Sequence, residues 1–252
     1  MATPRQVTVV TGGGRGIGAA VAVRLARAGH RVGIGYERAR ESAERTADAV
    51  RAEGGEALTV RLDTSVEEQV DALFDQVTEA FGPLTGLVNN AGISGPLGRF
   101  LDVSAEEWDR IFDVNVRGSF LVTRRIAPGM AERGFGRIVH LSSVSAERGG
   151  GVFGGVAYSA AKAALLGFSR ALARELGPSG VTVNSVAPGL IDTDITAGRL
   201  DPERKAAMVA DIPMGRTGTV TDVADVIAFL ARPESEYLTG VTYDINGGSH
   251  IH

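Results

Sequence analysis

The sequence of 252 residues contains no cysteine, and this absence removes three kinds of chemistry at once. Without a thiol, the chain cannot form a disulfide framework, use a thiolate nucleophile or hold a metal through cysteine. The lack of cysteine is compatible with a reducing compartment. The four histidines are dispersed, and His250 and His252 at the end of the chain do not form a metal-binding pattern. We therefore predict that the protein has no metal site.

The sequence also lacks an excess of one charge and a long apolar run. Its formal net charge is −4, and acidic and basic residues are interleaved, so it has no electrostatic footprint for nucleic acid. No run approaches the roughly 18 apolar residues that span a membrane. The polar start, Met1–Gln6, does not resemble a secretory signal. These absences favour a cytoplasmic protein that binds neither nucleic acid nor membranes.

What the sequence does contain is a regular alternation of apolar strands and helical segments. The predicted strands are Gln6–Val10, Arg31–Tyr36, Ala57–Leu62, Gly86–Asn89, Arg137–Leu141, Val181–Val186 and Val241–Ile245. Ile17–Ala28 and Val66–Phe81 between them have helical periodicity. This pattern predicts an α/β fold: a single domain over residues 1–252, with a Rossmann-type doubly wound parallel sheet of about seven strands and helices on both faces.

One segment, residues 193–216, breaks this alternation. It carries a short helical piece of its own at Pro202–Ala210. A long excursion that follows a sheet strand is typical of a lid over a bound ligand. We therefore predict a substrate lid at residues 193–216.

A glycine-rich turn, Thr11–Gly18, follows the first predicted strand and opens the first predicted helix. Glycines allow the backbone to approach a pyrophosphate closely, and the helix amino terminus offers free N–H groups to the anion. A plain tight turn is the alternative interpretation. The placement between a strand and a helix favours a dinucleotide site.

Further motifs follow this turn in a defined order. They are Asn89-Asn90-Ala91-Gly92 after the fourth strand, Asn115 in the next helical segment, Ser142-Ser143 after the fifth strand, Tyr158-Ser159-Ala160-Ala161-Lys162 at the start of a helix, and Pro188-Gly189 followed by Ile191 and Thr193. In this order they resemble the short-chain dehydrogenase/reductase family over nearly the whole chain, and the general pattern is similar to bacterial 3-oxoacyl-carrier-protein reductases. The resemblance implies a nicotinamide cofactor, a small carbonyl or alcohol substrate and a homotetramer.

The same resemblance implies which residues bind the cofactor. They are Gly12, Arg15, Gly16, Ile17, Gly18, Asp63, Asn89, Ala91, Gly92, Tyr158, Lys162, Pro188, Gly189, Ile191 and Thr193. Asp63 matches a family residue that contacts the adenine, although an acid before a helix can also serve that helix start. Both roles are open for this residue.

Tyr158 and Lys162 are the predicted catalytic pair. Their spacing of four places both side chains on one face of a helix. A nearby cation favours the phenolate, so we predict that Lys162 lowers the pKa of Tyr158 toward a range useful for proton transfer. The resemblance implies that Tyr158 protonates the carbonyl oxygen and that Lys162 holds the nicotinamide ribose. It also implies that Asn115 bends its helix and holds a relay water.

The catalytic serine has two candidates. The family usually places it thirteen residues before the tyrosine, which is Ser145 here, whereas the pair at the strand end offers Ser143, fifteen residues before. We favour Ser143, because loops tolerate insertion and the Gly149–Gly155 segment can hold the additional residues. Ser143 would stabilise charge on the substrate oxygen, and Ser145 remains the alternative.

The cofactor prediction depends on the end of the second strand. NAD recognition usually needs an acidic residue there, but this chain has Tyr36, followed by Glu37 and Arg38. Arg15 in the glycine turn matches a basic residue of NADP-using relatives, and a guanidinium suits a 2′-phosphate. Glu37 would repel that phosphate unless it points to solvent. We favour NADP, with NAD as the alternative.

For the reaction, we favour reduction of a 3-oxoacyl thioester or a related ketone. A sugar or polyol dehydrogenase of the same family is one alternative, and a dinucleotide sensor without catalysis is another. The segments that would decide the substrate are Ser94–Phe100, Ser145–Val156 and Ile195–Pro213.

Two other features bear on partners and packing. A carrier-protein partner would need a basic patch beside the cleft, for which Arg133, Arg137 and Arg148 are candidates. His140 lies inside an apolar strand, so we predict that it packs in the core rather than binding a ligand.

Overall fold

A computed structural model describes residues 5–95, 98–150, 154–193 and 201–251. Its centre is a seven-stranded sheet in the order β3-β2-β1-β4-β5-β6-β9, and each neighbouring pair is parallel. The strands are β1 (Val7–Val10), β2 (Arg31–Tyr36), β3 (Glu56–Arg61), β4 (Gly86–Asn89), β5 (Gly136–Leu141), β6 (Val181–Pro188) and β9 (Thr242–Ile245). The predicted fold class is confirmed, and the strand limits differ from the predicted ones by at most two residues.

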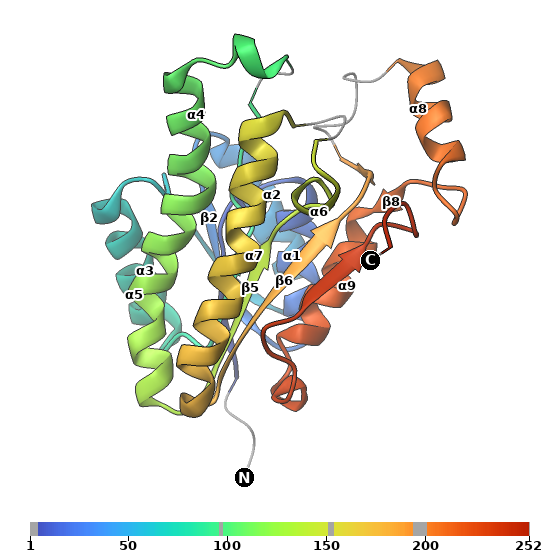
Figure 1. Ribbon diagram of the computed structural model, residues 1–252. Coiled ribbons are helices and arrows are strands. Elements are labelled where there is room, and N and C mark those ends of the chain that lie inside the picture. Colours follow the sequence, from blue (N-terminus) through green and yellow to red (C-terminus); the bar gives the residue numbers. More distant parts are fainter. Residues whose placement is uncertain (1–4, 96–97, 151–153, 194–200, 252) are drawn as a thin grey trace.

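Helices cover both faces of this sheet (Figure 1). One face carries α1 (Gly16–Arg27), α2 (Arg40–Ala52) and α9 (Val220–Leu230). The other face carries α3 (Glu67–Phe81), α5 (Gly118–Glu132) and α7 (Val156–Leu176). The shorter elements are η1 (Phe100–Asp102), α4 (Ala105–Phe112), η2 (Asp113–Arg117), α6 (Ser145–Arg148), η3 (Gly177–Ser179), β7 (Ile191–Asp192), α8 (Pro202–Ala210), β8 (Gly218–Thr219) and η4 (Pro233–Ser235).

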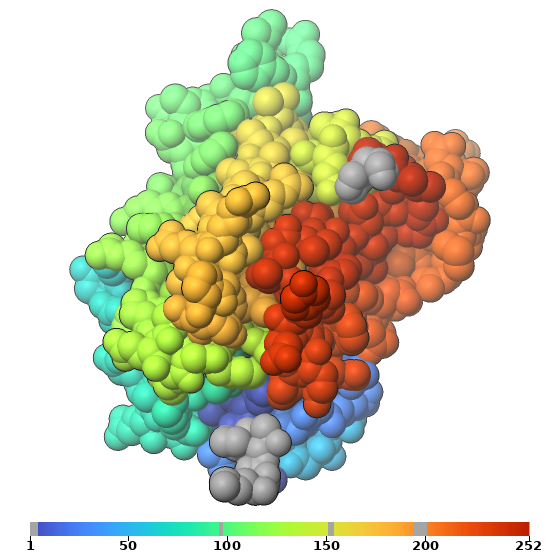
Figure 2. All heavy atoms as spheres, turned by 60° about the horizontal axis from the view of Figure 1, so that its bottom comes forward, coloured from blue at the N-terminus to red at the C-terminus, as the bar shows by residue number. Residues whose placement is uncertain are grey.

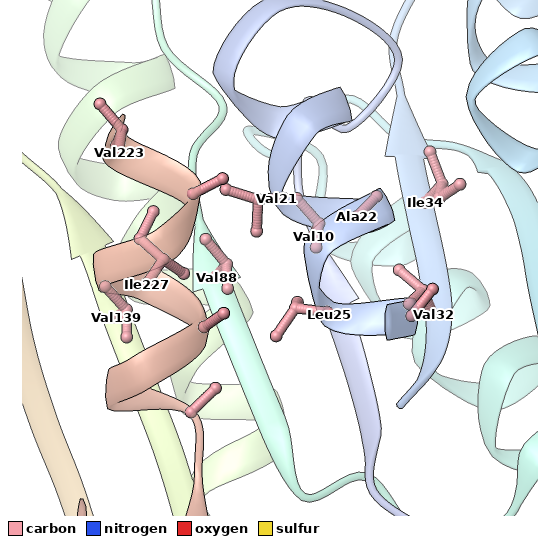
Figure 3. Close-up of a cluster of buried hydrophobic side chains, with 14 of the residues drawn as sticks. Val10, Val21, Ala22, Leu25, Val32, Ile34, Val88, Val139, Val223 and Ile227 are labelled. Atoms are coloured by element: carbon pink, nitrogen blue, oxygen red, sulfur yellow. The ribbon is translucent and has the colours of Figure 1, made fainter. Parts of the chain in front are cut away.

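The core between the sheet and its first helical face is aliphatic. Figure 3 shows α1 and α9 over the strands, with Leu25 of α1 and Ile227 of α9 near Val88 and Val139. All four side chains are at most 1% exposed. Full burial of each stabilises the fold by roughly 1.5–3 kcal/mol. Coverage on both faces is the reason that these strands lack polar alternation.

The side of the sheet to which the chain adds new strands changes between β1 and β4. From β1 the chain adds β2 and β3 on one side, whereas β4, β5 and β6 extend the other side. The carboxyl ends of all these strands lie at one edge of the sheet, which is the upper edge in Figure 1. Open α/β sheets bind ligands in the crevice at such a reversal point.

The opposite end of the molecule comes forward in Figure 2. There the segment near β9, in red, lies against the carboxyl-terminal part of α7, in yellow to orange. A Cβ atom on Gly240 would lie 3.4 Å from the Cβ atom of Ala173, so the two segments are in contact. No helix among the described residues is both long and apolar enough to span a bilayer.

The segment predicted as a lid is described in part. Its helical piece forms α8 as predicted, and Asp201 caps the helix by accepting a hydrogen bond from the Arg204 backbone N–H at 2.8 Å. The small parallel pair β7–β8 was not predicted, and it joins Ile191 to Gly218 on either side of the segment. Residues 194–200 lie outside the described residues. The single domain and the lid stay predictions.

Candidate active site

A cleft of about 1310 Å³ lies along the carboxyl ends of the strands. Its walls come from the glycine-rich turn, the ends of β2 and β4, the segment after β5, the start of α7, the segment after β6, and α8. The predicted cofactor residues that line it are Gly12, Arg15, Gly16, Ile17, Asp63, Ala91, Gly92, Tyr158, Lys162, Pro188, Gly189, Ile191 and Thr193. The structure therefore brings most of the predicted site together in one cavity.

The glycine-rich turn depends on glycine at defined positions. Gly12 and Gly16 have φ of 63° and 55°, in the left-handed region that L side chains rarely adopt. Gly18 does not line the cleft, but a Cβ atom on it would collide with the Gly12 carbonyl oxygen. Helix α1 begins at Gly16 without a side-chain cap, so its first N–H groups face the cleft wall. This arrangement fits a pyrophosphate.

Asn90, rather than Asn89, holds this turn from the side of β4. Asn90 Nδ2 donates to the carbonyl oxygens of Thr11 at 2.9 Å and Gly12 at 3.0 Å. Asn89 is buried, and its Nδ2 donates to Thr123 Oγ1 at 2.9 Å. The Asn89 side chain therefore faces the core at the end of β4 and does not line the cleft, so contact of this residue with the cofactor stays a prediction.

The end of the cleft beside β2 carries opposite charges. Arg38 Nε donates to Glu37 Oε1 at 2.8 Å, so the Glu37 carboxylate already has a cationic partner. Arg15 is exposed on the cleft wall and makes no ion pair with the described residues. Asp63 lines the cleft, and its Oδ1 accepts hydrogen bonds from the backbone and hydroxyl of Ser65 at 3.0 Å and 2.6 Å. The Asp63 carboxylate thus bonds the turn before α3 rather than the helix start itself, and its contact with the adenine stays a prediction.

Tyr158 and Lys162 contact the end of β5 in the part of the cleft away from β2. The Tyr158 phenol forms a hydrogen bond with Ser143. Lys162 is 3% exposed, and its Nζ donates to the Leu141 carbonyl oxygen at 2.6 Å. The same Nζ lies 5.7 Å from the centre of the Tyr158 ring. A phenol, a hydroxyl and a buried ammonium group therefore converge beside one wall of the cleft.

Burial controls the protonation of this pair. Tyr158 is half-buried in the cleft wall, and this burial raises the pKa of its phenol, although the Ser143 hydrogen bond opposes the change. Burial also lowers the pKa of Lys162 to about 8. The predicted net lowering of the Tyr158 pKa is therefore wrong, because burial raises it. Burial of the phenol outweighs the Ser143 hydrogen bond, and Lys162 Nζ is directed at the Leu141 carbonyl oxygen.

The two serine candidates occupy different positions. Ser143 forms the hydrogen bond with Tyr158, and its Oγ also accepts one from the Ser145 backbone N–H at 3.2 Å. Ser145 is buried at the start of α6. The geometry thus favours Ser143 as the partner of Tyr158. Residues 151–153 of the following loop lie outside the described residues.

Asn115 lies in η2, a π-helical turn between α4 and α5. Its Nδ2 donates to the carbonyl oxygens of Ile93 at 2.9 Å and Ile111 at 2.8 Å. Its Oδ1 is buried and has no hydrogen-bond partner among the described residues. A Cβ atom on Gly92 would lie 2.6 Å from this Oδ1 and 3.2 Å from Lys162 Nζ, so both atoms border the same space. Such π-turns are frequent at functional sites.

The three arginines considered for a carrier-protein patch do not cluster beside the cleft. Arg137 is 2% exposed and donates to the carbonyl oxygens of Arg232 at 3.0 Å and Pro233 at 2.9 Å. It stands near the amino end of β5, at the edge opposite the cleft. Arg133 Nη2 donates to the Leu84 carbonyl oxygen, two residues before β4 begins. Only Arg148 of the three lines the cleft, so these candidates do not form one patch beside it.

Comparison with known proteins decides the family. A family model described as "Enoyl-(Acyl carrier protein) reductase" matches residues 12–250. A short-chain type dehydrogenase/reductase of Sinorhizobium fredii, y4mP, is 44% identical over 238 residues, which are 94% of each chain. The chain belongs to the short-chain dehydrogenase/reductase family.

Other relatives of this short-chain dehydrogenase/reductase also match it over nearly the whole chain. The 3-oxoacyl-[acyl-carrier-protein] reductase FabG of Staphylococcus aureus is 37% identical and covers 96% of this chain and 97% of its own. The solved structure of levodione reductase matches with a TM-score of 0.91 and 36% identity, covering 96% of each chain. Family membership makes the protein an oxidoreductase enzyme that uses a nicotinamide cofactor. Among the described residues, no group of His, Asp and Glu could hold a metal ion.

Proposed function

We propose that this enzyme transfers a hydride between NADP(H) and a small carbonyl or alcohol substrate, with Tyr158 as the proton donor in reduction. The observation that carries the proposal is the convergence of the Tyr158 phenol, the Ser143 hydroxyl and the buried Lys162 ammonium at one wall of the cleft. When bound, the nicotinamide supplies or accepts the hydride.

The protein groups then have separate tasks. Tyr158, whose raised pKa keeps it protonated, gives its proton to the carbonyl oxygen, and Ser143 hydrogen-bonds the same oxygen. The Lys162 cation stabilises the phenolate that remains. The Oδ1 of Asn115, which has no partner in the part of the chain that the structure describes, borders the same space as Lys162 Nζ, and this supports the proposal that Asn115 holds a relay water.

The choice of NADP is supported by the charges at the end of β2. Arg15 is an exposed cation on the cleft wall, and Arg38 lines the same cleft. Glu37 is paired with Arg38, which offsets its repulsion of a 2′-phosphate. No acid occupies the end of β2 itself, where Tyr36 is found.

For the substrate, we propose a 3-oxoacyl thioester or a related ketone. The relative named as a 3-oxoacyl-[acyl-carrier-protein] reductase supports this class. The part of the cleft near α8 is lined by Leu190, Met208 and Ile212, which offers an apolar wall to an acyl chain or a ring. The poor clustering of Arg133, Arg137 and Arg148 gives no support to a carrier protein as the form in which the substrate arrives.

A panel of substrates run with both cofactors tests this proposal. It contains a 3-oxoacyl thioester with a short chain, the same acyl group on a carrier protein, levodione, and a set of sugars and polyols. We expect kcat/KM to be highest with NADPH and either the free 3-oxoacyl thioester or levodione. Oxidation of a polyol as the fastest reaction would contradict the substrate class. A higher kcat/KM with NADH would contradict the cofactor.

A further inference from the structure

Below the reacting groups, a line of buried polar side chains crosses the sheet. Asn89 Nδ2 donates to Thr123 Oγ1 at 2.9 Å, and this hydroxyl pairs with His140 Nε2 at 3.3 Å. His140 Nδ1 pairs with Ser169 Oγ at 2.8 Å, and Ser169 Oγ pairs with Ser185 Oγ at 2.7 Å. All five side chains are at most 3% exposed. His140 is thus buried as expected, but it is a bonded centre and not only a packing residue.

His140 is the first of four consecutive residues that each bond to α7. The Leu141 carbonyl oxygen accepts from Lys162 Nζ at 2.6 Å, and Ser142 Oγ donates to the Lys162 carbonyl oxygen at 2.9 Å. Ser143 completes the series with its hydrogen bond to Tyr158. Their partners on α7 are Ser169, Lys162 and Tyr158. The end of β5 is therefore hydrogen-bonded along the face of α7 that carries the catalytic pair.

The charges around His140 keep its ring neutral. Burial, together with the Lys162 cation on α7, lowers its pKa to about 3. The other elements packed against the ring bring neutral groups: Thr123 from α5, Asn89 from β4 and Ser185 from β6. Phe168 stacks on the ring with the centres 5.2 Å apart. The two hydrogen bonds of His140 therefore persist over the working pH range.

We propose that His140 is a positioning residue for Lys162 and Ser143. Its bonds to Thr123 and Ser169 hold the end of β5 between α5 and α7, so that the Leu141 carbonyl meets Lys162 and the Ser143 hydroxyl meets Tyr158. The effect on turnover rests on the proposed function. The effect on Lys162 does not, since it follows from the hydrogen bond at its Nζ.

The test replaces His140 with leucine in the full chain. His140→Leu fills space but cannot bond Thr123 or Ser169, so the strand end loosens and the Lys162 ammonium loses a well-placed acceptor. Because that acceptor favours the charged form, we expect the pKa of Lys162 to fall by about 0.5 unit or more. We also expect kcat to fall roughly 10-fold or more at little change in KM for NADPH, because the proton donor is misplaced.

The pKa of Lys162 can be measured directly, because Lys162 and Lys205 are the two lysines of the chain. Nuclear magnetic resonance of lysine labelled at Cε gives two signals in a pH titration without any substrate. Lys205, which pairs with Asp192 on the surface, is the internal reference. His140→Asn is the conservative variant: its amide replaces Nδ1 and keeps the bond to Ser169, so we expect most of the rate and of the Lys162 pKa to return.

His30→Leu is the matched control. His30 is also buried and neutral, and its Nδ1 pairs with Thr8 Oγ1 at 2.8 Å, near the amino ends of the strands. We expect it to lower stability but to leave kcat and the Lys162 pKa as in wild type. An unchanged or raised Lys162 pKa in folded His140→Leu, or equal changes of rate in both histidine variants, would overturn the inference. A shifted Lys162 pKa in a protein that reduces no carbonyl compound would support it and refute the proposed function instead.

Discussion

The two ends of the cleft use charge in opposite ways. At the reacting end, Lys162 is buried, its Nζ is fixed on a backbone carbonyl, and burial lowers its pKa. At the end beside β2, Arg15 and the Glu37–Arg38 pair are exposed to water. A buried charge interacts strongly with its neighbours, whereas an exposed one is screened. The reacting end should therefore tolerate almost no change, and the phosphate end should respond in small steps that depend on salt.

The largest effect within this comparison is expected for Lys162→Met. Removing the buried cation leaves the Tyr158 phenolate without stabilisation, so we expect kcat for reduction to fall by about 100-fold. In wild type, kcat/KM should fall as the pH rises through about 8, because Lys162 then loses its charge. The variant should lack this alkaline decrease. Steady-state kinetics between pH 6 and 10 provide the measurement, and an alkaline decrease that survives in Lys162→Met would show that another group titrates.

A smaller effect is expected for Gly18→Ala, which tests whether the turn is as tightly built as the geometry indicates. The new Cβ atom would meet the Gly12 carbonyl and lie 2.5 Å from Asn90 Nδ2. We expect the free energy of unfolding to fall by about 1–3 kcal/mol and NADPH binding to weaken.

Gly167→Ala on α7 is the matched control for this change, because its added Cβ atom would have no described neighbour within 4 Å beyond the adjoining residues and its own helix backbone. We expect that variant to gain about 0.5–1 kcal/mol, as helix interiors prefer alanine. Chemical denaturation and fluorescence titration of NADPH measure both variants. Equal responses of the two glycines would contradict the close packing inferred at Gly18.

Arg15→Gln tests the phosphate end. Loss of one exposed cation should weaken NADPH binding by about tenfold, as expected for a charged hydrogen bond, and should change NADH binding much less. Arg45→Gln, which alters an exposed arginine on α2 that does not line the cleft, is the control. Titrations at low and high salt should show the difference shrinking with salt. A similar loss for both cofactors would mean that Arg15 does not recognise a 2′-phosphate.

The smallest effect is expected for Glu37→Gln. The change frees Arg38 and removes a negative charge near the phosphate site, so NADPH affinity should rise by about two- to threefold, the scale of an exposed ion pair. The same titrations measure it. A marked loss of NADH affinity would identify Glu37 as the acceptor for a ribose hydroxyl, and NAD would then be the better assignment.

The sequence predicts the central sheet well because its strands carry long apolar runs. All seven were found from their composition and spacing, whereas β7 and β8 were missed, since two-residue strands contain no period. Helix α8 was predicted at its observed limits, because Asp201 and Pro202 form a clear start signal.

The site was harder to predict wherever orientation or burial decides. Asn89 and Asn90 are adjacent in the sequence, and only the end of β4 determines which side chain turns to the cleft. The pKa of Tyr158 depends on surrounding atoms that spacing along a helix does not describe. The position of Arg137 could have been predicted from the sequence. It lies at the start of a parallel strand, and strand starts lie at the edge opposite the ligand crevice.

Turnover by Tyr158→Phe tests the central claim most directly. The variant keeps the ring and removes the one proton that the mechanism transfers, while Tyr237→Phe changes a tyrosine that is 98% exposed and does not line the cleft. We expect Tyr158→Phe to reduce kcat by about 10³-fold with NADPH affinity near the wild-type value, and Tyr237→Phe to match wild type. Carbonyl reduction by Tyr158→Phe at a rate close to that of wild type would contradict the account.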